Sequence, residues 1–249
     1  MPEDERSPGA PDLTPDLDEA QWLELLAVGS LEVRGRMPWS SNGTFLVAVD
    51  AGDVGAQAIY KPEQGERPLW DFPEGIYRRE VAAYELSRAL GFGVVPETIV
   101  RDDAPFGTGS LQRFVDADFA EHYFTLLGVP EHDPALRRIA AFDLLANNAD
   151  RKGGHLLKDQ RGHIWGIDNG LCFHEDDKLR TVMWDYAGEQ VPDEAVAAAR
   201  TLVASLPEVL TELLDPRECD ALVERADRLV ESPYFPFPGG RRSHPWPLV

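Results

Sequence analysis

The sequence is poor in cysteine, with only Cys172 and Cys219 among its 249 residues. Two cysteines do not make a disulfide framework of the kind that holds small secreted domains together. Long apolar runs are also missing, because none approaches the roughly 20 residues needed to cross a bilayer. The first residues, MPEDERSPGAPDLTPDLDEA, lack the basic and apolar regions of a secretory signal. We therefore expect a cytoplasmic protein.

Basic residues are scarce as well. The chain has 24 Lys and Arg against 44 Asp and Glu, which gives a formal net charge of -20. A field of that sign repels nucleic acids and anionic lipid headgroups unless a local basic patch overrides it. We expect neither a nucleic-acid partner nor a stable membrane association. Hydrophobic residues make up 43% of the chain, which is ordinary for a globular protein.

The composition changes along the chain in four steps. Residues 1–18 are acidic and proline-rich, which predicts a disordered tail. Residues 19–115 are mainly strand-forming with one helix, and residues 116–232 are mainly helix-forming. Residues 233–249 combine prolines with aromatic residues, and we expect them to lie extended across the protein. A strand-rich half joined to a helix-rich half predicts an α+β protein of two lobes, with ligands bound between them.

The expected elements follow from local patterns. Alternating and β-branched residues predict strands, and apolar residues at helical spacing predict helices. A turn at residues 159–162 predicts a hairpin within the helical half. The expected strands are 44–49, 56–61, 98–101, 110–115, 155–158 and 163–168, and the expected helices are 79–90, one starting at 133–134, two starting near 193 and 207, and one starting from a capping box at 215–218.

Polar residues gather at the open end of this hairpin. Residues 147–155 (NNADRKGGH) precede its first strand, and Asp168 ends its second strand. Because the two open ends of a hairpin are adjacent, Asp150, His155 and Asp168 should be neighbours. Two carboxylates and an imidazole can hold a divalent metal and accept a proton. Asp-Asn-Gly alone is typical of a turn, but the two motifs joined by a hairpin favour a functional site.

Residues 148–151 (NADR) and 167–171 (IDNGL) resemble the catalytic and metal-binding motifs of type II phosphatidylinositol 4-kinases and of HipA-type bacterial toxin kinases. Residues 58–62 (AIYKP) resemble the strand with the phosphate-binding lysine, and residues 79–84 (REVAAY) resemble the start of the helix whose glutamate pairs with it. Residues 109–115 (GSLQRFV) resemble the last strand before the hinge. The resemblance spans roughly residues 35 to 175 and implies a two-lobed protein-kinase-like fold.

The resemblance also implies roles for individual residues in phosphoryl transfer from ATP. Asp150 would orient the attacking hydroxyl and take its proton, and Asp168 would hold Mg²⁺. Lys61 would contact the α- and β-phosphates while paired with Glu80. Arg151 beside Asp150 would neutralise the transferring phosphoryl group or an acidic substrate, or else, like Lys152, be a solvated loop cation.

Two further sets of residues are implied to contact the nucleotide. The backbones of Gln112 and Phe114 would bind the adenine edge from an extended hinge. Ser40, Ser41 and Asn42 would lie in the phosphate-covering loop, although Ser-Ser-Asn-Gly is also common in turns.

One position departs from the family pattern. Kinases of this type have an asparagine five residues after the catalytic aspartate, where it binds a second metal, and this chain has His155 there. Imidazole suits Mn²⁺ better than Mg²⁺. Either the preferred metal is Mn²⁺ or His155 contacts the substrate or a phosphate.

The acceptor stays open at this point. We expect the hydroxyl of a protein Ser or Thr, with autophosphorylation at Ser7 or Thr14 as one form, or a small polyol. The alternatives are a pseudokinase that binds nucleotide without turnover, a phosphatidylinositol kinase, a metal-dependent phosphohydrolase, and transfer of AMP in place of phosphate.

Overall fold

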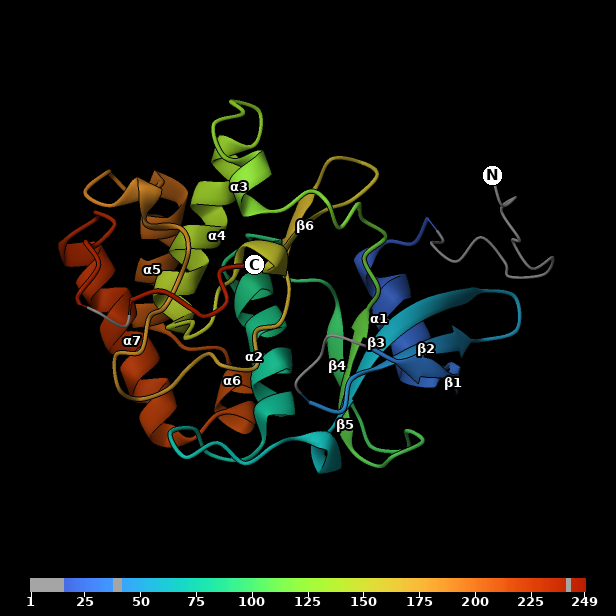
Figure 1. The fold of residues 1–249 in the computed structure, drawn as a ribbon. Coiled ribbons are helices and arrows are strands. Elements are labelled where there is room, and N and C mark those ends of the chain that lie inside the picture. The colour runs from blue at the N-terminus through green and yellow to red at the C-terminus, as the bar shows by residue number, and fades with distance from the viewer. Residues whose placement is uncertain (1–15, 38–41, 241–242) are drawn as a thin grey trace.

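The computed structural model describes residues 16–37, 42–240 and 243–249, and Figure 1 shows their arrangement. Five antiparallel strands form a sheet on one side of the molecule. The strands are β1 (Ser30–Arg36), β2 (Phe45–Asp50), β3 (Gly55–Pro62), β4 (Thr98–Arg101) and β5 (Gly109–Arg113), in the order β1-β2-β3-β5-β4. Helix α1 (Glu19–Val28) precedes the sheet, and helix α2 (Ile76–Ala89) connects β3 to β4.

The two faces of β3 have different neighbours. Its residues alternate between buried and half-buried, as expected of a strand with side chains on alternate faces. Tyr60 packs in a core with Trp22 and Leu26 of α1 and with Val47 of β2. Lys61, the next residue, therefore points from the opposite face, where it reaches α2. This alternation determines which face of the sheet can carry the chemistry.

Helices make up the rest of the molecule. They are α3 (Tyr123–Leu126), α4 (Asp133–Ala146), α5 (Asp193–Ala204), α6 (Glu208–Leu213) and α7 (Pro216–Glu231), with a small hairpin of β6 (Leu156–Lys158) and β7 (Ile164–Gly166). Figure 1 shows α2 between the sheet and the group formed by α4, α5 and α7. The largest core cluster joins α2 to these helices. In the described part of the chain, no helix has the length and apolar character needed to span a membrane.

Most expected elements are confirmed. Strand β4 has the expected bounds, the hairpin forms, and the capping box begins α7, where Asp215 accepts a hydrogen bond from Arg217. Other elements differ from expectation. Helix α2 begins at Ile76, three residues before the expected start, and β1 and α3 were not among the expected elements. Helix α1 was not predicted, because its residues were assigned to a strand-rich region with one helix. Strand β5 begins one residue early and ends at Arg113, two residues before the expected boundary.

The C-terminal residues lie against the helical part of the molecule. Phe235 is buried, and its backbone bonds to Gly188 and Glu189. Further on, the amide of Gly153 donates to the carbonyl of Leu248 at 2.7 Å. Figure 1 accordingly shows the C-terminus near the middle of the molecule. Of the aromatic residues expected to pack, Phe235 is buried, whereas Tyr234, Phe237 and Trp246 are 56%, 72% and 87% exposed.

Candidate active site

The polar loop after α4 is held in place by its own asparagines. Asn147 ends the helix in the left-handed conformation, with φ of 54°, and asparagine tolerates that conformation better than most residues. Its side chain donates to the carbonyl of Asp176 at 2.6 Å and accepts from the amide of Lys178 at 2.9 Å. Asn148 accepts from the amide of Asp150 at 2.9 Å. The position of Asp150 is therefore fixed by hydrogen bonds to a buried side chain.

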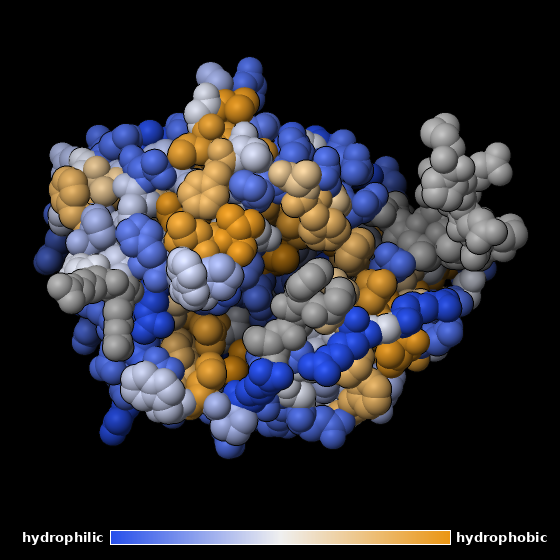
Figure 2. All heavy atoms as spheres, viewed as in Figure 1, coloured by the Kyte–Doolittle hydropathy of each residue, from blue (hydrophilic) through white to orange (hydrophobic). Residues whose placement is uncertain are grey.

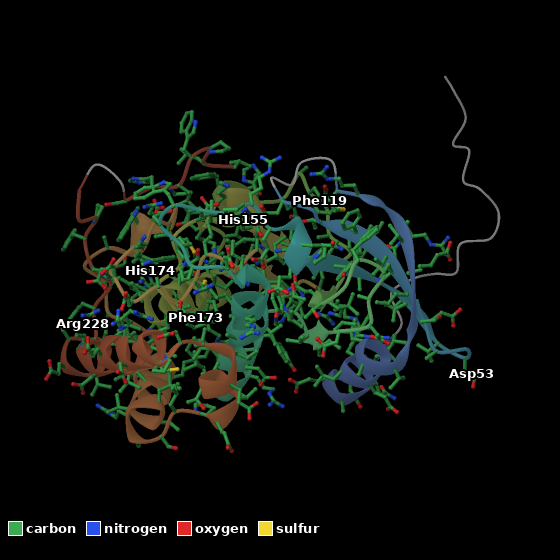
Figure 3. All side chains as sticks on the ribbon, turned by 90° about the horizontal axis from the view of Figure 1, so that it is seen from below. Asp53, Phe119, His155, Phe173, His174 and Arg228 are labelled. Carbon is green, nitrogen blue, oxygen red and sulfur yellow. The ribbon has the colours of Figure 1, made fainter. Side chains whose placement is uncertain are left out.

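The hairpin brings the expected residues together. The amide of Ile167 donates to the carbonyl of His155 at 2.9 Å, so the two open ends of the hairpin are joined. Asp168 then takes a positive φ of 58°. Its Oδ2 lies 3.4 Å from Nε2 of His155, and its Oδ1 lies 2.8 Å from Nζ of Lys61. Figure 3 shows His155 where the helical part meets the sheet.

Lys61 is the point at which the sheet, α2 and the segment after β7 meet. Its ammonium group contacts Glu80 as well as Asp168. Glu80 is 2% exposed, and its second oxygen accepts from the amide of Asn169 at 3.0 Å. Burial acts to lower the pKa of Lys61, but the charges of Asp168 and Glu80 outweigh it and raise that pKa above its usual value. Lys61 is therefore a permanent cation between two carboxylates.

The charges around Asp168 favour its ionised form. The Lys61 ammonium holds the pKa of Asp168 well below its usual range. Burial lowers the pKa of His155 to about 4, so its imidazole is neutral near pH 7. For Asp150, burial raises the pKa, and the ammonium of Lys152 at 2.8 Å opposes this shift. The site thus contains an ionised carboxylate, a neutral imidazole and a second carboxylate of higher proton affinity.

These residues fit a divalent cation held partly by phosphate. Among the residues that the structure describes, no group of three or more His, Cys, Asp or Glu side chains is arranged to hold a metal ion alone. Asp168 and His155 supply two adjacent donors, and the Asp168 side chain is 54% exposed. Mg²⁺ is commonly bound by one or two carboxylates, with substrate phosphates and water completing its coordination. The donor set therefore suits a metal bound together with a phosphorylated nucleotide.

Arg151 corrects one expectation. Its side chain is completely buried, and all three guanidinium nitrogens donate within the protein. Asp143 accepts from Nε and Nη2 at 2.9 Å each, Asn169 accepts from Nη2 at 2.7 Å, and the carbonyl of Ile167 accepts from Nη1 at 2.7 Å. The prediction that Arg151 neutralises a phosphoryl group is wrong, and Arg151 is not a solvated loop cation either. It joins α4, the polar loop at residues 147–155 (below called the catalytic loop) and the segment after β7.

Asp143 and Asn169 were not singled out in the sequence. Asp143 also accepts from the side chain of Asn148 at 3.1 Å, so it holds two residues of the loop. One signal was present: Asp143 follows Leu136 and Ile139 at helical spacing, so it is a carboxylate on the apolar face of α4. A charged residue on such a face is rarely buried unless it is paired.

The adenine contacts are corrected as well. Gln112 lies inside β5, paired with Ile59 on one side and Thr98 on the other, so its backbone belongs to the sheet. The amide of Phe114 donates to the carbonyl of Gln57 at 3.1 Å and is therefore occupied. The chain leaves the sheet after Phe114. A separate apolar cluster follows there, formed by Val115, Ala117 and Leu157 with Trp165 and Ile167 packed against it.

The phosphate-covering loop is only partly described. Ser40 and Ser41 lie outside the described residues. The side chain of Asn42 accepts from the amide of Arg67 at 3.2 Å, and the amide of Gly43 donates to Gly65 at 2.9 Å. A Cβ at Gly43 would lie 3.1 Å from the Cα of Gly65, so this close approach favours glycine. The end of the loop is thereby fixed to the segment after β3.

Comparison with known sequences identifies relatives. No protein-family model matches the chain. The chain is 41% identical to Protein Rv2133c of Mycobacterium tuberculosis, over 90% of its own length and 94% of that protein. The chain belongs to the Rv2133c family. It is also 28% identical to phosphatidylinositol 4-kinase gamma 4 of Oryza sativa subsp. japonica, over 66% of the chain, and 32% identical to that of Arabidopsis thaliana, over 43%. It covers only 35% and 23% of those two plant proteins.

Two solved structures have a similar fold. Hydra Fam20 with sugar matches with a TM-score of 0.56 and 15% identity, over 88% of this chain and 90% of that one. The Helicobacter pylori proinflammatory kinase CtkA matches with a TM-score of 0.50 and 10% identity, over 84% and 94%. The predicted α+β, two-lobed, protein-kinase-like fold of this Rv2133c relative is confirmed. The matches support an atypical kinase-like protein.

Proposed function

We propose that the protein is an ATP-dependent phosphotransferase that transfers the γ-phosphoryl group to a hydroxyl. The observation that carries this proposal is the contact of Lys61 with both Glu80 and Asp168. It joins a strand, a helix and a hairpin end that are far apart in the sequence. A permanent cation beside an ionised, half-exposed carboxylate suits the phosphates and the metal of a nucleotide.

Each residue then has a role. Lys61 binds the α- and β-phosphates and is oriented by Glu80. Asp168 holds Mg²⁺ or Mn²⁺, and His155, neutral and 3.4 Å away, is the second ligand. Such a cation neutralises charge on the phosphates. Asp150 orients the acceptor hydroxyl and takes its proton, and Lys152 at 2.8 Å is its charge partner.

The nucleotide base requires an apolar surface next to the phosphates. We assign the adenine to the cluster of Val115, Ala117 and Leu157, in place of Gln112 and Phe114, because Ile167 of the same cluster directly precedes Asp168. Ser40, Ser41 and Asn42 remain the proposed phosphate-covering loop. The proposed division between the lobes stays near residue 115, and a cytoplasmic location stays part of the proposal.

The second candidate is a pseudokinase that binds nucleotide without turnover. It is favoured by His155, which is at the position of the second-metal asparagine and contacts Asp168. We also propose that the chain is related to type II phosphatidylinositol 4-kinases and HipA-type kinases. A lipid acceptor is disfavoured by the net charge of -20. A protein Ser or Thr, or a small polyol, is the proposed acceptor.

The test is nucleotide turnover by purified protein with ATP and either Mg²⁺ or Mn²⁺. Wild type is compared with Asp150→Asn, which keeps the shape of the side chain, and the products are separated. We expect ADP from wild type and little from Asp150→Asn. AMP as the product would indicate transfer of the nucleotide instead. ATP protection against heat without any turnover would favour the pseudokinase. Equal ADP from both proteins would sink the role given to Asp150.

A further inference from the structure

The helical part of the molecule contains a cavity of about 1100 Å³. Its walls come from the C-terminal end of α4, from residues 177–188 after the active-site hairpin, from α7, and from residues 234–240 and Ser243 of the C-terminal extension. Figure 2 shows hydrophilic and hydrophobic side chains side by side in the region where Figure 1 draws α7. The active-site residues Lys61, Asp168 and His155 do not line this cavity.

The charge of the cavity is opposite to that of the chain as a whole. Among the described residues that line it, four are cations and one, Asp177, is a carboxylate. The four are Lys178, Arg180, Arg225 and Arg228. Asp177 lies 3.1 Å from Arg228, and Lys178 and Arg180 lie 3.4 and 3.9 Å from Asp71. In a chain with a net charge of -20 this local excess of positive charge is a basic patch of the kind that attracts anions.

Arg225, which lines the cavity, has a donor nitrogen that is buried beneath the cavity surface. It is 6% exposed, and burial lowers its pKa to about 10. Its Nε and Nη1 donate to the carbonyls of Leu145 and His174 at 2.8 and 3.3 Å. Its Nη2 is buried with no acceptor among the described residues. A buried guanidinium without a carboxylate partner is unfavourable by itself, so an anionic ligand would stabilise it.

The cavity is directly connected to the catalytic loop. The amide of Arg180 donates to the carbonyl of Asn148 at 2.9 Å, and the carbonyl of Arg180 accepts from the amide of Arg151 at 3.0 Å. Asp150 lies between these two loop residues. Burial raises the pKa of Asp150, and the positive charge of Arg180 counteracts part of that rise. Arg180, a residue of the cavity lining, is therefore bonded to the residues on both sides of the proposed proton acceptor.

We propose that this cavity is the acceptor site and that it binds a polypeptide segment with acidic residues beside its hydroxyl. The inference rests on the phosphoryl transfer proposed above. A volume of about 1100 Å³ is larger than most small-molecule pockets. The wall also carries Trp184 and the half-exposed Tyr234, with Phe237 at 72% exposure. Cations and aromatic side chains together suit a peptide that is both acidic and partly apolar.

In the proposed transfer, one bond to the γ-phosphorus breaks for each one that forms. The bond between the γ-phosphorus and the bridging oxygen breaks, and its electron pair leaves with ADP. A bond forms between the same phosphorus and the acceptor oxygen, and the hydroxyl proton passes to Asp150.

The experiment measures peptide binding to the full chain by fluorescence anisotropy. The probe is a labelled peptide with one serine flanked on both sides by glutamates, and its control has glutamines in place of the glutamates. Arg228→Glu reverses a charge at the cavity, where the side chain is 58% exposed. Arg217→Glu makes the same change on α7 outside the cavity, at 79% exposure. We expect Arg228→Glu to weaken binding about tenfold or more, the scale of a lost hydrogen bond between charged groups, and Arg217→Glu to leave it nearly unchanged.

Equal binding of the two peptides would overturn the proposal, because the acidic side chains would then contribute nothing. Equal losses in the two variants would also overturn it, because only the net charge of the protein would then matter. Inorganic phosphate that protects against heat, without peptide binding, would show a small-anion site instead. Binding with the expected variant pattern but no phosphate on the serine, in a sample that turns over ATP, would refute the acceptor role. Protection of the protein against heat by ATP is measured in a separate sample. A protein that binds the peptide but not ATP would contradict the proposed function, whereas peptide binding by the cavity would stand.

Discussion

Two of the cation–carboxylate pairs in the described part of the chain differ in what surrounds them. Arg151 and Asp143 are 0% and 1% exposed in their side chains, and Arg151 has all three nitrogens bonded within the protein. Lys61 is 20% exposed, and beyond its partner Glu80 it also contacts Asp168, whose side chain is 54% exposed. One pair is closed, and the other opens towards solvent.

This difference separates a structural role from a functional one. In a closed pair every hydrogen-bonding group is used, so no atom is left for a ligand and the pair can only hold segments together. In the open pair, Asp168 is accessible, and a ligand can take over contacts that the side chains now make with one another. Both pairs join opposite charges, and the degree of burial determines whether a pair has a structural or a functional role. Replacing the cation with methionine in each pair tests this interpretation.

The largest effect is expected for Arg151→Met. The substitution leaves the Asp143 carboxylate buried with only the side chain of Asn148 as partner. Breaking a fully buried pair by removing one partner costs about 3–5 kcal/mol. We expect the free energy of unfolding in urea to fall by that amount. Arg151→Lys, which keeps the charge but not the forked geometry, should lose less. A loss within experimental error for Arg151→Met would contradict the bracing role.

Lys61→Met should have the opposite profile, with a smaller loss of stability and a larger loss of activity. Glu80 keeps the amide of Asn169 as a partner, so we expect stability to fall by about 2 kcal/mol. Loss of a cation aimed at the phosphates should reduce kcat about 10²–10³-fold. Unfolding in urea and steady-state turnover measure the two effects. If Lys61→Met were as unstable as Arg151→Met, the distinction between open and closed pairs would fail.

The next effect concerns the open pair alone. His155 contacts Asp168, and a neutral imidazole suits Mn²⁺ better than Mg²⁺. His155→Asn restores an oxygen donor at that position. We expect the ratio of Mg²⁺-supported to Mn²⁺-supported turnover to rise about tenfold, within the range seen for changes around metal sites. His163→Asn, in the turn of the hairpin just before β7, is the control. An unchanged ratio in His155→Asn would remove His155 from the proposed metal ligands.

The sequence was informative where neighbours in space are also close along the chain. Asp168 and His155 could be placed together because they lie at the open end of one hairpin. It failed where burial depends on distant segments. Arg151 is closed off by Asp143 on α4 and by Asn169 beyond β7. The position of Asp143 on the apolar face of its helix was a signal that went unused, whereas nothing local indicated the contact with Asn169. Phe114 was misplaced because its amide pairs with Gln57, more than fifty residues earlier.

The smallest effect is expected for a third pair, which is fully open to solvent. Arg34 and Glu32 on β1 lie 3.1 Å apart, with side chains 51% and 68% exposed. Exposed pairs contribute about 0–1 kcal/mol, because water screens both charges in the folded state. We expect Arg34→Met to change the free energy of unfolding by less than about 0.5 kcal/mol and to leave turnover unaffected. With the same substitution at all three cations, stability loss should rank Arg151, Lys61, Arg34, whereas activity loss beyond what unfolding explains should be confined to Lys61. A loss at Arg34 that matched the loss at Lys61 would show that distance between charges, not burial, determines the effect.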